Sequence, residues 1–138
     1  SDEALCHGQF YGLQYANPQS EQYDSHHIFS YLRGTENELL LIATNFSENS
    51  KECGITVPEE AFAYFGINHN NTVHNAVELL TGEKLQLPLN PCDKIEVTIP
   101  ANSGIIIKFN ILSFFVTGNR FHTIRFCWLN IITGSLCY

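Results

Sequence analysis

The sequence predicts an antiparallel all-β domain, and two observations lead to this prediction. From Ile28 onward, short apolar runs are separated by turn residues, which is the usual pattern of domains built from antiparallel strands. The clearest strand covers residues 94–99, where Ile95, Val97 and Ile99 alternate with polar neighbours. The chain has 138 residues, of which 44% are hydrophobic and 15% charged, so we expect one domain around one core.

Two further elements follow from the residue pattern in the middle of the chain. Residues 39–46 are apolar at successive positions, so both faces of this strand need cover and we expect it to lie centrally in a sheet. Residues 58–66 begin with proline and two glutamates and end with glycine, which are the start and stop signals of a short helical turn. We expect this helical turn to be an insertion between strands and not a second layer.

Turn residues in the second half predict two chain reversals. A Thr-Gly-Glu turn separates residues 73–80 from residues 84–89, so these two segments should pair as a hairpin. Residues 100–104 are rich in the turn formers Pro, Asn, Ser and Gly. They should reverse the chain into the apolar run at residues 105–109.

The N-terminal region differs from this pattern. It carries four apolar side chains at roughly helical spacing, followed by an Asn-Pro break. These side chains are Phe10, Tyr11, Leu13 and Tyr15. Residues 1–25 are therefore predicted to be a lead-in that packs on the sheet or on a neighbouring domain, and residues 26–110 to be the β domain itself.

The C-terminal region also differs in composition. Residues 111–138 contain no Asp or Glu, whereas all 14 acidic residues lie before Ile99. Two interpretations stay open: a further β-hairpin, or a segment foreign to the domain. An unpaired apolar strand in this tail could also join two chains into a homodimer.

Four short motifs, in one order along the chain, resemble those of a known family. Residues 8–13 resemble a Gly-x-Phe-Tyr-Asp-Leu junction, with Gly12 in place of the acid. Residues 29–33 (Phe-Ser-Tyr-Leu-Arg) and the strand that ends in Thr44-Asn45-Phe46-Ser47 are similar to a second signature. Residues 78–83 and 98–107 are similar to a later hairpin and a final strand. Together they resemble the C-terminal all-β domain of bacterial α-amylase-family glycoside hydrolases.

This resemblance implies an antiparallel Greek-key β-sandwich of the glycosyl hydrolase C-terminal type, attached to a (β/α)8 barrel that cleaves α-glucosidic bonds. In the family, an Asp nucleophile, a Glu general acid and a second Asp lie on the barrel. A barrel takes ~250 residues, more than this chain has, and none of its carboxylates matches those three. The resemblance thus predicts that the chain is no enzyme by itself. It would be a non-catalytic accessory domain that stabilises the barrel of a parent acting on starch and malto-oligosaccharides.

The aromatic residues, 12% of the chain, leave two interpretations open. In the first, an exposed patch packs on the catalytic barrel. It would consist of Phe10, Tyr11, Leu13 and Tyr15. In the second, the chain is a carbohydrate-binding module whose rings stack on α-glucan, although such residues also commonly fill a core or a domain interface. The candidates for stacking are Tyr31, Tyr64, Phe65 and Trp128.

Charge and motif content exclude several other classes of function. The net charge of -7 and the pI near 5.2 argue against nucleic acid or an anionic membrane as a partner. No apolar run reaches the ~20 residues that a membrane helix needs. The five cysteines are odd in number and far apart. A loop could bring His69 and His74 together, but no further ligand accompanies them, so surface histidines are the preferred interpretation and we expect no metal and no cofactor. The compartment stays open between secreted, periplasmic and cytoplasmic, and an unrelated β-sandwich for adhesion or ligand binding is a third, weaker reading.

Overall fold

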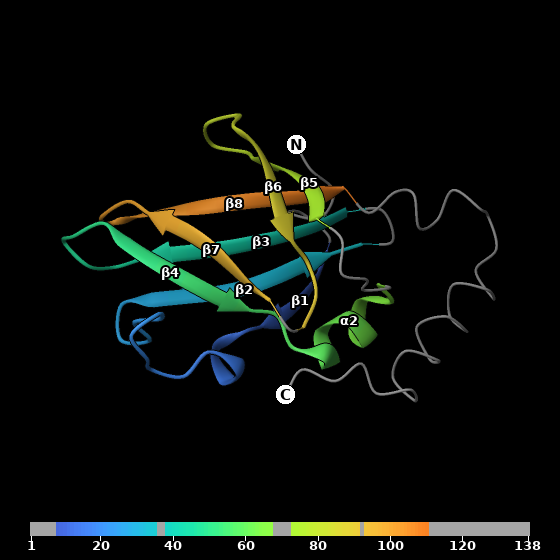
Figure 1. Ribbon diagram of the computed structural model, residues 1–138, viewed down its shortest axis with the longest axis horizontal. Helices are drawn as coiled ribbons and strands as arrows, with labels where there is room; N and C mark the ends of the chain where they lie inside the picture. The colour runs from blue at the N-terminus through green and yellow to red at the C-terminus, as the bar shows by residue number, and fades with distance from the viewer. Residues whose placement is uncertain (1–7, 36–37, 68–72, 92, 111–138) are drawn as a thin grey trace.

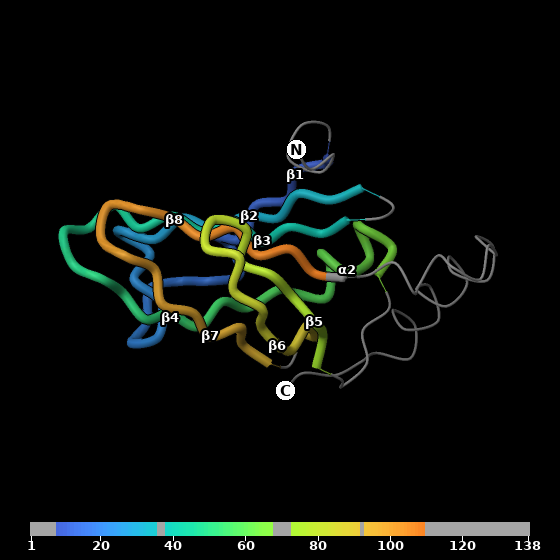
Figure 2. Tube along the Cα trace, turned by 90° about the horizontal axis from the view of Figure 1, so that it is seen from above, coloured from blue at the N-terminus to red at the C-terminus, as the bar shows by residue number. Residues whose placement is uncertain are grey.

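The strands of the described residues form two antiparallel sheets that face each other. The computed structural model describes residues 8–35, 38–67, 73–91 and 93–110. Its elements are β1 (Gln9–Gly12), η1 (Gln14–Ala16), β2 (Ile28–Gly34), β3 (Glu38–Asn45), β4 (Lys51–Thr56), α2 (Glu59–Phe65), β5 (Val73–Glu78), β6 (Lys84–Pro88), β7 (Lys94–Ile99) and β8 (Ser103–Asn110). The large sheet has the order β1-β2-β3-β8-β5-β6, and the small sheet pairs β4 with β7. In Figure 2, β1, β2, β3 and β8 form one layer and β4 and β7 the other, while the β5–β6 end of the large sheet curves toward β7. The two layers confirm the predicted antiparallel sandwich; its Greek-key connectivity stays a prediction.

The main core lies between the sheets because each sheet turns an apolar face inward. From β3, Leu39, Leu41 and Ala43 are at most 1% exposed. They belong to one cluster with Ile95 and Ile99 of β7, which are equally buried. The alternation predicted for β7 is therefore confirmed.

Strand β3 is buried on both faces. It pairs with β2 on one side and with β8 on the other. On the outer face of the large sheet, away from the small sheet, Leu40 and Ile42 are only 0% and 6% exposed. They form a second apolar cluster with Tyr31, Leu79 and Ile106. The predicted central position of β3 is confirmed. The outer face of the large sheet carries an apolar patch beside Arg33 and the ion pair of Lys108 with Glu38 at 2.8 Å.

The helical turn and the hairpin lie where the sequence predicts them. Strands β5 and β6 pair from Val73 opposite Pro88 to Val77 opposite Lys84. Helix α2 connects β4 with β5 and lies at one end of the sandwich (Figure 1). It ends at Gly66, whose φ of 69° is a left-handed conformation that glycine adopts at little cost.

Part of the N-terminal segment packs on the large sheet as a strand and a turn, although its apolar residues have roughly helical spacing. Strand β1 pairs antiparallel with β2 at the sheet edge, and the short 3-10 turn η1 follows it. Over so few residues, the spacing of Phe10, Tyr11 and Leu13 fits a strand and a turn as well as a helix, and the pairing with β2 decides between them. Leu13 is 0% exposed and belongs to the core, so the prediction that it lies in an exposed interface patch is wrong.

Three predictions concern the tail and fall outside the described residues. These are the additional hairpin or foreign segment at residues 111–138, the sugar-stacking role of Trp128, and a homodimer through tail strands. All three stay predictions.

A buried asparagine ties the large sheet to the small one. Asn45 ends β3 and is 1% exposed. Its Nδ2 donates to the carbonyl oxygens of Asn49 at 2.8 Å and Ile99 at 3.0 Å, and its Oδ1 accepts from the main-chain N–H of Ser47 at 2.9 Å. Because Ile99 ends β7, this one side chain fixes where the ends of the two layers meet.

A second buried asparagine acts at the opposite end of the small sheet. Asn17 is 3% exposed, and its Nδ2 donates to the carbonyl oxygens of Leu13 and Thr56, both at 2.9 Å. Its Oδ1 accepts from the N–H of Thr56 at 2.7 Å. Thr56 ends β4, so the turn after β1 is attached to the strand that leads into α2.

A buried carboxylate holds the β5–β6 turn against β8. Glu78 is 7% exposed, and its oxygens accept main-chain hydrogen bonds from Leu80, Thr81 and Ile106 at 2.9 to 3.2 Å. Burial alone would raise the pKa of Glu78, but these donors favour the charged form and hold its pKa below the ordinary value. The fold is therefore stabilised by the ionised carboxylate.

Replacement of Asn45 by alanine should lower the free energy of unfolding by about 2 kcal/mol or more, because several buried main-chain groups lose their partner. Chemical denaturation measures this loss. Asn49→Ala is the matched control, since Asn49 contributes only main-chain atoms to the network and its side chain is exposed. Equal losses in the two variants would contradict the role of Asn45.

The contribution of Glu78 should depend on pH. Its folded pKa is lowered, so its contribution is present above the ordinary pKa of 4.5 and is lost as the pH falls through the folded pKa, because the unfolded chain takes up the proton first. The stability difference between wild type and Glu78→Gln should thus shrink as the pH falls below the ordinary pKa of 4.5. Glu83→Gln changes an exposed carboxyl in the same turn and is the control. A constant difference for Glu78→Gln would argue against the charged carboxylate.

Candidate functional site

Aromatic side chains gather on both faces of the sheet edge formed by β1 and β2. Consecutive residues of a strand point to opposite faces. Phe10 therefore faces the outer side of the large sheet, where it contacts Tyr31, while Tyr11 lies opposite the buried Leu32 on the core side. These two neighbours in sequence begin two separate clusters.

The first, the outer-face cluster, consists of Phe10, Phe29 and Tyr31. The ring centroid of Tyr31 lies 5.0 Å from that of Phe10 and 5.7 Å from that of Phe29. Phe10 is 52% exposed and Phe29 40%, whereas Tyr31 packs on the buried Leu40 and Ile42 of β3. The cluster thus extends the apolar patch on the outer face of the large sheet to the sheet edge. Such a continuous apolar surface is typical of a contact with another protein surface.

The second, the edge cluster, consists of Tyr11 from β1, Tyr15 from η1, and Tyr64 and Phe65 from α2. The ring centroid of Tyr11 lies 6.2 Å from Tyr15, 5.2 Å from Tyr64 and 6.2 Å from Phe65. Tyr11 and Phe65 pack against the main core. Tyr15 and Tyr64 are 62% and 49% exposed, so two rings face solvent on a base of two partly buried ones.

Polar groups connect the edge cluster. The hydroxyl of Tyr15 donates to Oε2 of Glu60 at 3.2 Å and lies 2.5 Å from the hydroxyl of Tyr11. Because Tyr15 has one hydroxyl hydrogen, Tyr11 is the donor in the bond between the two tyrosines. Desolvation, followed by the hydrogen bond with Tyr11 and the charge of Glu60, raises the pKa of Tyr15 above its ordinary value. The hydroxyl therefore stays a donor at neutral pH.

Helix α2 reaches this position because Gly34, at the end of β2, has no side chain. A Cβ at Gly34 would lie 2.8 Å from Cδ1 and 2.9 Å from Cε1 of Phe65, closer than close-packed atoms tolerate. The placement of Phe65, and with it that of the neighbouring Tyr64, depends on this glycine.

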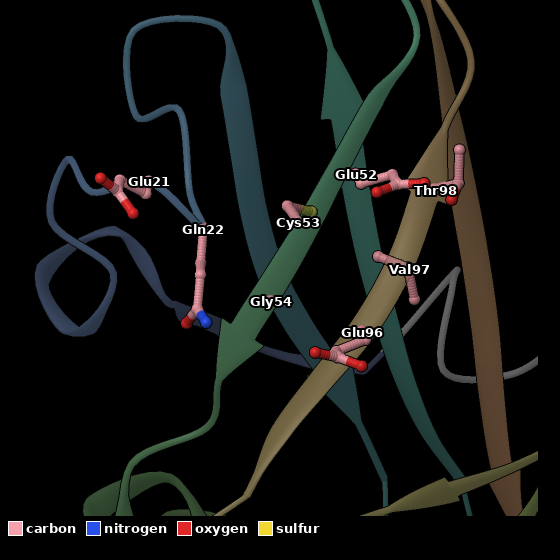
Figure 3. Close-up of a pocket in the computed structure, with 8 residues that line it drawn as sticks. All are labelled: Glu21, Gln22, Glu52, Cys53, Gly54, Glu96, Val97 and Thr98. Atoms are coloured by element: carbon pink, nitrogen blue, oxygen red, sulfur yellow. The ribbon is translucent and has the colours of Figure 1, made fainter.

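A pocket of about 420 Å³ lies apart from both clusters, between β4, β7 and the loop at residues 21–22. Figure 3 shows Glu52 and Glu96 on the neighbouring strands and Glu21 on the loop. All three are exposed, and no aromatic ring lines the pocket. Burial raises the pKa of Cys53 in its wall to about 11, so the thiol is not a nucleophile at neutral pH. The pocket offers solvated carboxylates and lacks the rings for sugar stacking.

Other kinds of site are not found in the described part of the chain. Residues 8–35, 38–67, 73–91 and 93–110 contain no group of three side chains that could hold a metal ion. Within the same residues, no helix has the length and hydropathy to span a bilayer.

Each aromatic cluster combines residues predicted to pack on the barrel with residues predicted to stack on sugar. In the edge cluster, Tyr64 and Phe65, predicted to stack on sugar, contact residues predicted for the barrel interface. In the outer-face cluster, Tyr31, predicted to stack on sugar, contacts Phe10, predicted for the barrel interface. Phe29 is absent from both sets, although its position two residues before Tyr31 in a strand indicates the same face.

The fold is similar to part of several solved α-amylases, in agreement with the resemblance in the sequence. An α-amylase from Anoxybacillus matches with a TM-score of 0.50 and 15% identity over 78% of this chain and 19% of that one. The α-amylase from Geobacillus thermoleovorans, complexed with acarbose, matches with a TM-score of 0.51 and 12% identity over 78% of this chain and 19% of that one. A maltogenic α-amylase from Thermotoga neapolitana matches with a TM-score of 0.53 and 13% identity over 79% of this chain and 22% of that one.

The chain thus spans about a fifth of the length of these structures, and at such identities the likeness establishes the fold. No family model and no curated protein sequence matches the chain.

Gly34→Ala should displace Phe65 and lower the free energy of unfolding by about 2 kcal/mol, as overpacking usually does. Chemical denaturation measures the loss, and the near-ultraviolet circular dichroism of the tyrosines should change with it. Gly12→Ala is the matched control in the adjacent strand, because its Cβ would meet only ring atoms of Phe10 at an ordinary 3.6 Å and beyond. An unchanged spectrum for Gly34→Ala would contradict the dependence of the edge cluster on this position.

Proposed function

We propose that the chain is a non-catalytic accessory domain of a glycoside hydrolase that acts on α-glucans such as starch and malto-oligosaccharides. Its role is to stabilise the catalytic (β/α)8 barrel of a larger protein by covering apolar surface. The observation that carries this proposal is the apolar patch on the outer face of the large sheet.

A sandwich of two sheets already has its core and does not need a second apolar face. Outer positions of antiparallel sheets are commonly polar because they face water. Here Leu40 and Ile42 form the centre of an outer apolar surface, and Phe10 and Phe29 continue it with 52% and 40% exposure. A neighbouring domain that covers this surface would remove these rings from water.

The first described strand adds to the outer-face surface. Phe10 is paired with Arg33, so both side chains lie on the outer face. Arg33 Nη2 donates to the carbonyl oxygen of Gly8 at 2.8 Å. Gly8 therefore lies beside the outer-face cluster.

The carboxylates of the described residues support a non-catalytic role. Glycoside cleavage needs two carboxyl groups about 5 to 9 Å apart on either side of the bond. The exposed Glu21, Glu52 and Glu96 line a pocket without stacking rings, and the edge cluster contains Glu60 alone. The similarity to about a fifth of several α-amylases supports a parent whose catalytic residues lie outside this segment.

The edge cluster favours a second function, the binding of α-glucan by surface aromatics. Tyr64 is exposed beside Tyr15 and Glu60, which gives rings and hydrogen-bonding groups on one surface. Tyr31 faces the other side with two phenylalanines and is a poorer candidate. Trp128 lies outside the described residues.

The absence of catalysis can be tested directly. The purified chain, incubated with starch, should release no reducing sugar, whereas an α-amylase added to the same preparation should release it. An antibody raised against the chain should detect a native protein larger than 15.6 kDa by at least the ~250 residues of a barrel. Starch hydrolysis by the chain alone, or a native protein of 15.6 kDa, would overturn the proposal.

The outer-face contact has its own test. Phe29→Ser should lower the stability of the isolated chain only modestly, because Phe29 is 40% exposed there and loses chiefly its contact with Tyr31. In the larger protein the same change should lower the temperature at which starch hydrolysis is lost. Equal behaviour of wild type and variant in the larger protein would mean that this face is not covered by the barrel.

A further inference from the structure

The edge cluster combines the two chemical features that sugar binding requires. Sugar rings present apolar C–H faces that stack on aromatic rings, and hydroxyl groups that need hydrogen-bond partners. We propose that Tyr15 and Tyr64 form a stacking surface for an α-glucan chain and that Glu60 accepts hydrogen bonds from its hydroxyls. The choice of an α-linked glucan rests on the proposed function, whereas the stacking surface rests on the geometry of the cluster.

The two exposed rings are held in place from below. Tyr11 contacts both of them, with centroid distances of 6.2 Å to Tyr15 and 5.2 Å to Tyr64. Phe65 meets the Tyr64 ring at 90° and 5.0 Å, and both Tyr11 and Phe65 pack on the main core. Rings that are already ordered lose little conformational freedom when a ligand stacks on them.

The polar part of the site is also arranged in advance. Tyr11 donates to Tyr15, and Tyr15 donates to Oε2 of Glu60. A carboxylate offers about four acceptor positions. Within the described residues, the Glu60 carboxylate accepts one hydrogen bond, from Tyr15, and its side chain is exposed, so acceptor positions are open to ligand hydroxyls.

The other surfaces described above fit a sugar less well. The rings of the outer-face cluster are two phenylalanines and one tyrosine. The charged groups on that face already have partners, since Lys108 pairs with Glu38 and Arg33 donates to the carbonyl oxygen of Gly8. The pocket beside the small sheet has carboxylates but no ring. The edge cluster alone among these three combines exposed rings with an ordered hydroxyl and carboxylate network.

Titration of the full chain with maltoheptaose, by calorimetry, tests the site. Tyr64→Ala and Tyr15→Ala should each raise the dissociation constant roughly fivefold or more, because each removes one stacking ring. Phe46→Ala is the matched control: this ring is 70% exposed, more than either tyrosine, and belongs to neither cluster. It should bind like wild type. Denaturation curves establish that all the variants fold, and two separate tyrosine variants guard against a local loss of structure in one of them.

The outcomes separate this inference from the proposed function. Absence of maltoheptaose binding, or binding that neither tyrosine variant weakens, overturns the inference and leaves the accessory role on the outer face unaffected. Cellohexaose, a β-linked glucan, is the second ligand. Binding of cellohexaose in preference to maltoheptaose would overturn the α-glucan assignment and count against the proposed parent enzyme as well.

Discussion

The arrangement of this domain depends on the directional bonds that two buried asparagines, Asn45 and Asn17, make between its layers. Apolar contact brings the two layers together, but it is non-directional and would tolerate a shifted alignment. Asn45 fixes the end of β3 against the end of β7, and Asn17 fixes η1 against the end of β4. Because α2 begins three residues after Thr56, the bond from Asn17 also sets the point from which the helix places Tyr64 and Phe65.

The two clusters show how one short edge strand serves two surfaces of different chemistry. Phe10 and Tyr11 are neighbours in β1, yet the first adds to an apolar face and the second to a surface with hydroxyls and a carboxylate. The strand alternation that separates them is a backbone property. What distinguishes the surfaces is what lies next to each residue: aliphatic strands β3 and β8 on one side, and η1 and α2 on the other.

Features with a long or strongly marked pattern could be predicted from the sequence. The alternation of β7, the two apolar faces of β3, the β5–β6 hairpin and the stop of α2 at Gly66 all rest on local signals that the structure confirms. The edge strand β1 could not be recognised, because four residues are too few to separate two periods. The clusters could not be assembled either, since each joins segments that only the pairing with β2 and the close approach of Phe65 to Gly34 bring together.

The place of β8 in the large sheet has a consequence for synthesis on the ribosome. Strands β1, β2 and β3 form one ladder and β5 and β6 another, and β8 joins them by pairing with both β3 and β5. It is also the last described strand to leave the ribosome. The large sheet therefore cannot form completely until nearly all of residues 8–110 have been synthesised. Until then, the edges of β3 and β5 that pair with β8 stay unpaired. Long-range pairing of this kind is intrinsically slow and exposes strand edges to other chains.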